Sequence, residues 1–254
     1  MGYQIDLNSD LGESFGDFKV GNDAALLPLL TTANVACGWH GGDPVVMEKT
    51  VRAAKEYGIA VGAHPGYPDL MGFGRRDMKL TPAQIKAYIK YQVGALDAFV
   101  RSSGMKLQHV KAHGALGNKA MVDEMTANAV CDAVLEYDPE LMVFGHANSL
   151  FLEIAKDKGL RTVSEIYMDR AYLDNSMLVP RSQKGAMIED VNVAIERSVR
   201  LITTGKVLSI TGKELTMQAD SLCVHGDTPQ ALEYLITLRK ALEEKGIAIR
   251  GLQR

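Results

Sequence analysis

The chain has 254 residues, of which 46% are hydrophobic and 23% are charged, and its formal net charge is -3. These values are typical of a globular protein and exclude a disordered, collagen-like or coiled-coil chain. The slightly acidic balance and the absence of a Lys/Arg-rich run argue against nucleic acid or an anionic membrane as the partner. Small molecules and other proteins are therefore the expected partners.

The sequence contains no segment of the kind that crosses or enters a membrane. No apolar stretch approaches the ~20 residues needed to cross a bilayer, and the first residues lack the basic and apolar segments of a secretory signal. Cys37, Cys131 and Cys223 are odd in number and far apart, which fits reduced thiols better than a disulfide framework. We therefore expect a cytoplasmic protein.

Short β-rich runs alternate with longer helical patterns, an order typical of βα units around a parallel sheet. The predicted strands cover residues 3–8, 32–37, 59–64, 108–113, 142–146, 162–167 and 221–225. No linker or low-complexity tract interrupts this order, so we expect a single domain over residues 1–254. The predicted fold is α/β, an irregular TIM-like (β/α) barrel of about seven parallel strands.

Several helix ends are marked by their own chemistry. Over residues 81–103, apolar side chains recur at three- and four-residue spacing, which predicts a helix with one face packed on the sheet. Asp43-Pro44, Thr81-Pro82 and Thr228-Pro229 each combine a capping side chain with a proline suited to the first turn, and Gln84 completes a capping box with Thr81. Glycines that should end helices are Gly58, Gly104 and Gly159.

Two connections, residues 65–80 and 169–187, are unusually long and rich in Gly, Pro, Asp and Arg. Loops of this length in a compact domain are usually functional covers or are disordered. Arg75 in the first loop and Arg170 and Arg181 in the second suit the capture of a phosphate or carboxylate, although exposed arginines without a ligand are commoner.

Five of the six histidines lie at or just after the C-terminal end of a predicted strand: His40, His64, His113, His146 and His225. In βα barrels the reacting groups collect at that end, because the βα loops converge there. A single histidine in such a place is more often a hydrogen-bonded structural residue, and this interpretation is preferred for His146 alone. The shared position of the group favours a common site.

The first strand runs into the sequence Asp6-Leu7-Asn8-Ser9-Asp10-Leu11-Gly12-Glu13. Alternation places Asp6, Asn8 and Asp10 on one side of the strand. An inward row of acids is costly unless a metal, a cation or a proton meets it. A solvated turn is the competing interpretation for Asp10 and Glu13, but we favour a functional role.

Lys111 and His113 are two residues apart, so they lie on one side of a strand and can reach a common ligand. A lysine inside a barrel needs a counter-charge, which Asp6 or Glu165 could supply. The alternative is that Lys111 ends its strand in solvent. Glu165 and Asp169 flank the second long loop and add carboxylates to the same rim.

Two segments, His40-Gly41-Gly42-Asp43-Pro44 and His225-Gly226-Asp227-Thr228-Pro229, follow one pattern. In each, a strand ends in histidine, glycine permits a tight turn, and a capped helix begins with its amides directed to the barrel mouth. Such a helix start can hold a carboxylate or phosphate, so His40, Asp43 and Asp227 are candidate substrate- or phosphate-binding residues. An ordinary βα turn, with the acids acting only as caps, is the competing interpretation.

The sequence lacks a Walker-type phosphate loop, a dinucleotide fingerprint and a nucleophile elbow. Acid–base or metal-assisted chemistry is therefore favoured over a serine hydrolase or a dehydrogenase. Asp10, His64 and His113 are candidate metal ligands, since an acid and two imidazoles from different strand ends suit a divalent cation such as Mg²⁺ or Zn²⁺.

The remaining polar groups of the rim suit acid–base catalysis without a metal. Asp6 or Glu165 could act as general base toward water, with Lys111 or His225 stabilising the developing oxyanion. The full set of candidate catalytic residues is Asp6, Asn8, Lys111, Glu165, Asp169 and His225.

Taken together, these segments resemble the LamB/YcsF family. The matching pieces are residues 6–13 (DLNSDLGE), 34–44 (NVACGWHGGDP), 62–69 (GAHPGYPD), 111–116 (KAHGAL), 169–172 (DRAY) and 223–229 (CVHGDTP). They follow the family order over nearly the whole chain and are highly specific as a set. The chain departs from the family pattern at Ala112, where proline is usual, at Gly117, where tyrosine is usual, and at Asn175-Ser176, where Asp-Gly is common. These departures concern loop geometry, because none removes an ionisable candidate.

The resemblance implies ATP-dependent hydrolysis of 5-oxo-L-proline to L-glutamate, with two partner subunits, B and C, supplied by separate chains. Phosphorylation of the lactam oxygen would open the ring carbon to attack by water. The resemblance further implies that the partners help to form the activated species and that this chain helps to open the ring. The family is also similar in fold to metal-dependent sugar deacetylases, which is an analogy of fold alone.

Two other functions stay open at this point. A stand-alone metal-dependent amidohydrolase or carbohydrate deacetylase would bind metal and act without ATP or partners. A non-catalytic lactam-binding subunit would bind its ligand without needing the acids and histidines. The dense ionisable rim disfavours the second, because a passive site for a small acid needs one cation and few carboxylates. The sequence also leaves a homo-oligomer open.

Overall fold

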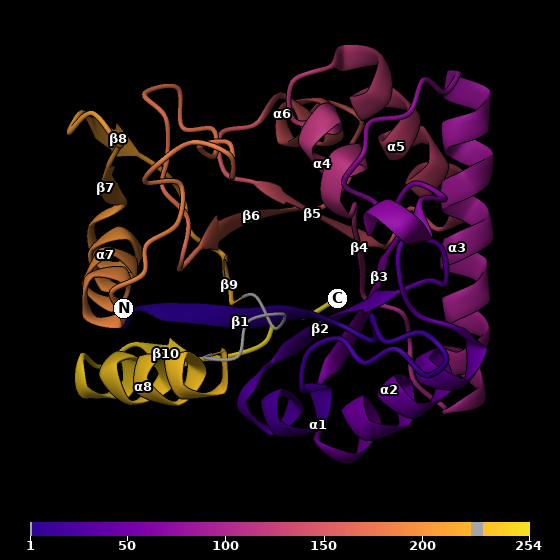
Figure 1. Ribbon diagram of the computed structural model, residues 1–254, viewed down its shortest axis with the longest axis horizontal. Coiled ribbons are helices and arrows are strands. Elements are labelled where there is room, and N and C mark those ends of the chain that lie inside the picture. Colours follow the sequence, from indigo (N-terminus) through magenta and orange to yellow (C-terminus); the bar gives the residue numbers. More distant parts are fainter. Residues whose placement is uncertain (1, 225–230) are drawn as a thin grey trace.

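The computed structural model describes residues 2–224 and 231–254 (Figure 1). The strands of the main sheet are β1 (Gln4–Leu11), β2 (Thr32–Ala36), β3 (Ala60–His64), β4 (His109–Lys111), β5 (Met142–His146), β6 (Thr162–Tyr167) and β9 (Ser221–Cys223). All neighbouring pairs are parallel, and β9 pairs with both β6 and β1, which closes the ring. The predicted seven-stranded TIM-like barrel is confirmed.

Helices lie outside the barrel, with α2, α3 and α5 grouped on one side and α7 and α8 on the other in Figure 1. The helices are α1 (Asp23–Leu26), α2 (Pro44–Glu56), α3 (Pro82–Ser102), α4 (Gly114–Ala120), α5 (Glu124–Tyr137), α6 (Leu150–Asp157), α7 (Val191–Thr204) and α8 (Ala231–Glu244), with short 3-10 turns η1 (Leu27–Leu29) and η2 (Leu70–Gly72). Within the described ranges, no helix is long and apolar enough to cross a membrane.

The predicted helix over residues 81–103 is confirmed as α3. Thr81 and Gln84 form the expected capping box at its start, and its apolar face is buried in the core at positions that include Ile89 and Leu96. Asp43 caps α2 by accepting from two backbone amides. Glycines with positive φ follow three helices as predicted: Gly58, Gly104 and Gly159.

Three short strands were absent from the sequence-based expectation. β7 (Lys206–Leu208) and β8 (Glu214–Thr216) form an antiparallel hairpin, and β10 (Ala248–Ile249) adds to β1 beside Gln4 and Ile5. Elements of two or three residues are too short to show an alternating pattern. β1 also extends to Leu11, beyond the predicted end at residue 8, so that it carries Asp10 as a strand residue.

The strand register places polar side chains inside the barrel. Asp6 lies opposite Ser221, and Asp10 lies opposite Asn34. Because side chains alternate along a strand, the other residues of β1, such as Leu7 and Leu11, join the hydrophobic core. The interior of the barrel therefore carries a column of polar side chains, with Phe144 stacked on His109 as an apolar neighbour.

Candidate functional site

A cavity of about 520 Å³ opens where β1, β3, β4 and β6 end, which is the C-terminal mouth of the barrel. Its ionisable lining comprises Asp10, His64, Arg75, Lys111, His113, Tyr167, Arg170 and Arg181. The strand ends and both long loops therefore meet at one cavity. This is the place where a βα barrel carries its chemistry.

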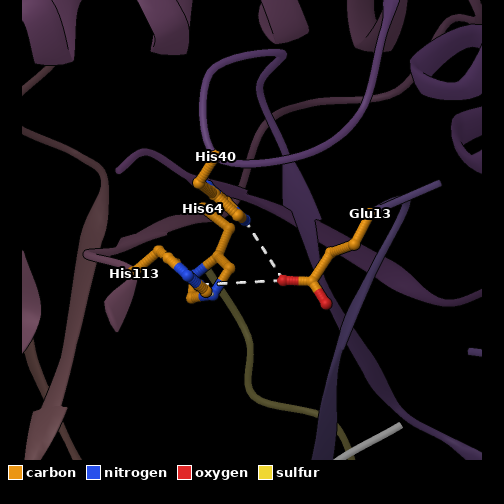
Figure 2. A group of neighbouring side chains, drawn as sticks. All are labelled: Glu13, His40, His64 and His113. Atoms are coloured by element: carbon orange, nitrogen blue, oxygen red, sulfur yellow. Dashed lines mark hydrogen bonds and ion pairs between the residues drawn. The ribbon is translucent and has the colours of Figure 1, made fainter. Parts of the chain in front are cut away.

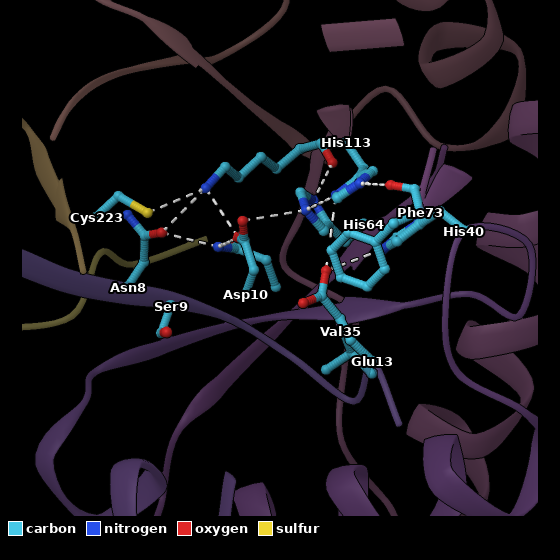
Figure 3. A network of polar contacts seen from close by, with 12 residues as sticks. Asn8, Ser9, Asp10, Glu13, Val35, His40, His64, Phe73, His113 and Cys223 are labelled. Carbon is cyan, nitrogen blue, oxygen red and sulfur yellow. Dashed lines mark hydrogen bonds and ion pairs between the residues drawn. The ribbon is translucent and has the colours of Figure 1, made fainter. Parts of the chain in front are cut away.

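Lys111 is a buried cation that lines the cavity. Three of its neighbours, Asn8, Asp10 and Cys223, are labelled in Figure 3. Lys111 Nζ donates to Asp10 Oδ1 at 2.9 Å and forms an ion pair with Glu165 Oε1 at 2.7 Å. The same nitrogen lies 3.4 Å from Asn8 Oδ1 and 3.4 Å from Cys223 Sγ. Burial alone would lower the pKa of Lys111, but the acidic neighbours outweigh it and hold the pKa well above its usual value. Lys111 is therefore a charged ammonium inside the protein.

Asn34 holds the side chains around that ammonium in place. Its Nδ2 donates to Asp10 Oδ1 and to Asn8 Oδ1, both at 2.8 Å. Its Oδ1 lies 2.8 Å from Nε2 of His109, whose Nδ1 faces Gln108 Oε1 at 3.0 Å. Asn34 was not among the candidate residues, because its contacts depend on the pairing of β2 with β1, which places it opposite Asp10.

Glu165 is buried between two partners. Beside the ion pair with Lys111, its Oε2 accepts a hydrogen bond from the Tyr167 hydroxyl at 2.6 Å. Burial, together with the Glu165 charge, raises the pKa of Tyr167 well above its ordinary value, so the phenol keeps its proton and donates it. Tyr167 also lines the cavity, and the sequence analysis did not single it out.

Asp6 lies deeper in the barrel than the cavity. Its carboxylate accepts hydrogen bonds from Thr31 Oγ1 at 2.7 Å, from Thr32 Oγ1 at 2.6 Å and from the Ser221 hydroxyl. Burial raises its pKa despite these donors. Ser221 in turn accepts from Asn8 Nδ2 at 2.7 Å, so Asp6 connects to the site through other side chains and does not line the cavity.

Three histidines and one glutamate form a compact buried cluster beside the cavity (Figure 2). It consists of Glu13, His40, His64 and His113, and one ligand atom from each lies within 4.8 Å of the others, so the group could hold a metal ion. His64 Nε2 lies 3.0 Å from His113 Nδ1, and His40 Nε2 lies 3.1 Å from Glu13 Oε1. Burial lowers the pKa of His113 to about 3 and that of His40 well below its usual value, so both rings are neutral near pH 7.

The predicted metal set is partly within this cluster. His64 and His113 belong to it, and Asp10 Oδ2 lies 3.3 Å from His64 Nε2 on the side of Lys111. Glu13, which the sequence left between a functional role and a solvated turn, is buried and contacts His40. Gly41 packs against the backbone of Glu13, where a Cβ would lie 2.9 Å from the Glu13 carbonyl oxygen.

The arginines approach the cavity from the two long loops. Arg170 is buried, and its guanidinium donates to the Val179 carbonyl oxygen at 2.6 Å. Burial, followed by the nearby charge of Arg181, lowers the pKa of Arg170. Arg75 lies over the Phe73 ring at 5.2 Å. Asp169 is buried next to Arg170 in the chain but does not line the cavity.

Other candidates have local partners. Asp43 accepts from the amides of Val45, Val46 and Gly16 at 2.8–2.9 Å, and these donors lower its pKa; it does not line the cavity. His146 is buried, and its Nε2 donates to a backbone carbonyl oxygen in the second long loop. The candidates His225 and Asp227 lie outside the described residues.

The chain has clear relatives among known proteins. Residues 5–254 match the model of the LamB/YcsF family. The A subunit of 5-oxoprolinase from Alkaliphilus metalliredigens is 50% identical over 97% of this chain and 96% of its own length. The crystal structure of the lactam utilization protein from Thermus thermophilus is 45% identical, covers 98% of this chain and all of its own, and has a TM-score of 0.94.

A more distant likeness concerns the fold alone. A family 4 carbohydrate esterase from Streptomyces lividans has a TM-score of 0.51 at 13% identity, covering 97% of this chain and 91% of its own. The barrel expected from the sequence is thus found in these neighbours as well. The match over residues 5–254 and the 50% identity over nearly full length establish that the chain belongs to the LamB/YcsF family.

Proposed function

We propose that this chain is the A subunit of an ATP-dependent 5-oxoprolinase and that it opens the lactam ring in the cavity at the barrel mouth. The observation that carries the proposal is the 50% identity, over 96% or more of both chains, to a protein named as the A subunit of 5-oxoprolinase. The cavity volume of about 520 Å³ lies in the range of small-molecule sites.

Opening the lactam sets three demands on a site. Water must lose a proton to a base as its oxygen bonds to the ring carbon, an oxygen on that carbon gains negative charge, and the base must return the proton to the ring nitrogen when the C–N bond breaks. From a lactam phosphorylated on its oxygen this step gives an acyl phosphate, and a second water then releases inorganic phosphate and leaves L-glutamate. The substrate carboxylate also needs a cation. A site for this reaction therefore requires a base, an oxyanion-stabilising group and an anion-binding group.

Lys111 is the group that we assign to the developing oxyanion. It lines the cavity as a buried ammonium and is fixed from two sides by Asp10 and Glu165. A preorganised charge in a site shielded from water stabilises a transition state more than the same charge in water. Glu165 and Tyr167 act here as positioning residues.

Asp10 is the carboxylate that we assign as general base. The sequence suggested Asp6 or Glu165 for this role, but neither carboxylate lines the cavity. Asp6 is held by three hydroxyl groups below the cavity, and Glu165 is held between Lys111 and Tyr167. Asp10 lines the cavity directly, so a water molecule in the cavity could reach it without passing another side chain.

Arg170 and Arg181 are the groups that we assign to the negative charge of the substrate. Both line the cavity, as does Arg75. A guanidinium matches the two oxygens of a carboxylate, and equally the oxygens of a phosphoryl group. These arginines therefore suit both 5-oxo-L-proline and a form phosphorylated on its lactam oxygen.

ATP use is assigned to the complex, with the B and C subunits forming the activated lactam. The sequence of this chain has no Walker-type phosphate loop, which supports this division. Because ATP is the co-substrate, we place the complex in the cytoplasm.

A coupled assay tests the proposal. L-Glutamate release from 5-oxo-L-proline is measured with the purified chain alone, with the B and C subunits, and with and without ATP. We expect release only when the three proteins and ATP are all present. Asp10→Ala should abolish it while circular dichroism shows an intact fold. Release by the complete complex without ATP, or near-normal release with Asp10→Ala, would contradict the proposal.

The histidine and glutamate cluster supports a second candidate, a stand-alone metal-dependent amidohydrolase. Three imidazoles and a carboxylate in one buried group are more than oxyanion chemistry on Lys111 requires. This candidate predicts that the isolated chain, supplied with Zn²⁺ but without ATP, hydrolyses an amide. The same assay distinguishes the two candidates.

A further inference from the structure

His64 and His113 turn one nitrogen of each ring toward the other. His64 Nε2 lies 3.0 Å from His113 Nδ1, and the two rings are perpendicular, at 89°. The other, outer nitrogen of each ring faces a backbone carbonyl oxygen. His64 Nδ1 lies 2.7 Å from the carbonyl oxygen of Lys111, and His113 Nε2 lies 2.8 Å from the carbonyl oxygen of Phe73. A carbonyl oxygen only accepts, so both outer nitrogens carry the ring protons.

This arrangement leaves a lone pair on each inner nitrogen when both rings are neutral. Two lone pairs that face each other at 3.0 Å repel unless a cation lies between them. Metal-binding histidines characteristically donate their outer N–H to a backbone carbonyl or a carboxylate, which fixes the tautomer and directs the other nitrogen at the metal. His64 and His113 both have this arrangement.

Glu13 supplies a third ligand atom. Its Oε1 lies 3.7 Å from His113 Nδ1 and within 4.8 Å of the His64 ligand atom. In a tetrahedral zinc site with bonds of about 2.0–2.1 Å, ligand atoms are roughly 3.3 Å apart. The two separations of 3.0 and 3.7 Å lie on either side of that value.

His40 has a different role in the same cluster. Its ring is stacked on that of His113 at a centroid distance of 3.6 Å and an angle of 2°. The lone pair of a ring nitrogen lies in the ring plane, and two parallel planes share no point. His40 and His113 therefore cannot both bind one ion in this arrangement. His40 Nε2 instead donates to Glu13 Oε1, which orients the carboxylate.

We propose that His64 Nε2, His113 Nδ1 and Glu13 Oε1 bind one divalent transition metal ion of the Zn²⁺ type, with His40 positioning Glu13. Two imidazoles and a carboxylate suit Zn²⁺ rather than Mg²⁺, which prefers oxygen ligands. His64 and His113 line the cavity, so the remaining coordination position is open to it. The role of the ion in catalysis rests on the proposed function, where a Lewis acid would polarise a substrate carbonyl oxygen.

This set differs from the one suggested by the sequence, because Glu13 takes the place of Asp10. Asp10 Oδ1 is already held by Lys111 and Asn34, and Asp10 is outside the compact group of four. Asp10 Oδ2 lies beside the metal site, 3.3 Å from His64 Nε2. We assign this oxygen to the general base and not to the ion. Asp10→Asn should therefore keep the ion, whereas Glu13→Gln should weaken its binding.

The test measures metal binding by the isolated full chain without substrate. After treatment with a chelator, the chain is titrated with Zn²⁺ and, in parallel, with Mg²⁺ by calorimetry, and with Co²⁺ by visible absorption. We expect one Zn²⁺ per chain, a Co²⁺ spectrum of a four-coordinate site, and no saturable Mg²⁺ binding. The double variant His64→Ala/His113→Ala should lose the ion, and His40→Gln should bind it about 10–100-fold more weakly at unchanged stoichiometry.

His146→Gln is the matched control, since His146 is a buried histidine at a strand end outside the cluster, and it should bind Zn²⁺ like the wild type. If the alanine variant does not fold, Glu13→Gln, which is nearly isosteric, decides the question. No saturable Zn²⁺ binding, or equal binding by the cluster variants, would overturn the proposal. Neither result depends on glutamate release, so the metal site and the 5-oxoprolinase activity can fail separately.

Discussion

Lys111 and Glu165 form an ion pair inside the barrel, with Nζ 2.7 Å from Oε1 and side chains that are 7% and 1% exposed. Removing two charges from water is costly, and their attraction offsets the cost only while both are present. The intact pair therefore adds little to the free energy of unfolding. Removing only one partner, however, leaves the other as an uncompensated buried charge. The pair also holds the ammonium at the cavity.

Lys111→Met should destabilise the fold by about 3–5 kcal/mol, because it leaves Glu165 as a buried charge without its cation. Adding Glu165→Gln to Lys111→Met should recover part of that loss. The free energy of unfolding in urea measures both effects. As a control, Lys86→Met removes an exposed pair with Glu136 and should cost less than about 1 kcal/mol. A double variant no more stable than Lys111→Met would show that the ion pair does not cause the loss.

Gly62→Ala should destabilise the protein by about 1–3 kcal/mol through overpacking. A Cβ at Gly62 would lie 2.1 Å from atoms of the His109 ring, and His109 has no room to move because it is fully buried. Gly94→Ala is the matched control. It lies within α3 with its nearest neighbour at 3.8 Å, so it should stabilise by about 0.5–1 kcal/mol. Thermal unfolding of both variants checks the contrast, and equal effects would contradict it.

The sequence was sufficient to predict the barrel because the seven barrel strands and the longer helices carry local sequence signals. Alternation in β1, the capping box at Thr81 and the glycine after α2 are all properties of neighbouring residues. Closure of the ring, with β9 between β6 and β1, follows from the general geometry of βα units.

The arrangement of the site could be predicted only in part, because it depends on register between distant strands. Because reacting groups of a βα barrel collect at the C-terminal ends of its strands, the sequence alone identified His64, Lys111 and His113 as neighbours in space. The sequence alone has limits, however. It could not indicate that Asn34 joins Asp10 to Asn8, since that contact requires the pairing of β1 with β2. Nor could it separate Asp6 from the cavity, because Asp6 and Asp10 follow the same alternation and differ only in depth along β1.

Acid should destabilise the protein through His109, whose pKa burial lowers from 6.5 to about 3. As the pH falls below 6.5, the unfolded chain binds a proton at this residue while the folded chain does not until about pH 3, so stability decreases over this range. The decrease reaches at most about 1.4 kcal/mol per pH unit for one group.

His109→Gln isolates this effect, because the amide can still donate to Asn34 but does not titrate. The free energy of unfolding is compared for wild type and variant at several pH values between about 7 and 5, a window that spans the ordinary histidine pKa of ~6.5. The wild type should lose stability faster than the variant. Identical slopes would mean that His109 is not the group responsible.

Arg181 provides the sharpest test of how the cavity binds its substrate, because it lines the cavity yet is exposed, so its replacement should leave the fold intact. Hydrogen bonds to a charged group contribute about 1.5–3 kcal/mol. Arg181→Gln should therefore raise the KM for 5-oxo-L-proline by roughly 10–100-fold in the complete complex with ATP, with a smaller effect on kcat. Arg52→Gln, at an arginine 73% exposed on α2, should leave both constants unchanged. A decrease in kcat at constant KM would instead place Arg181 in the chemical step, and no change in either constant would remove it from the binding site.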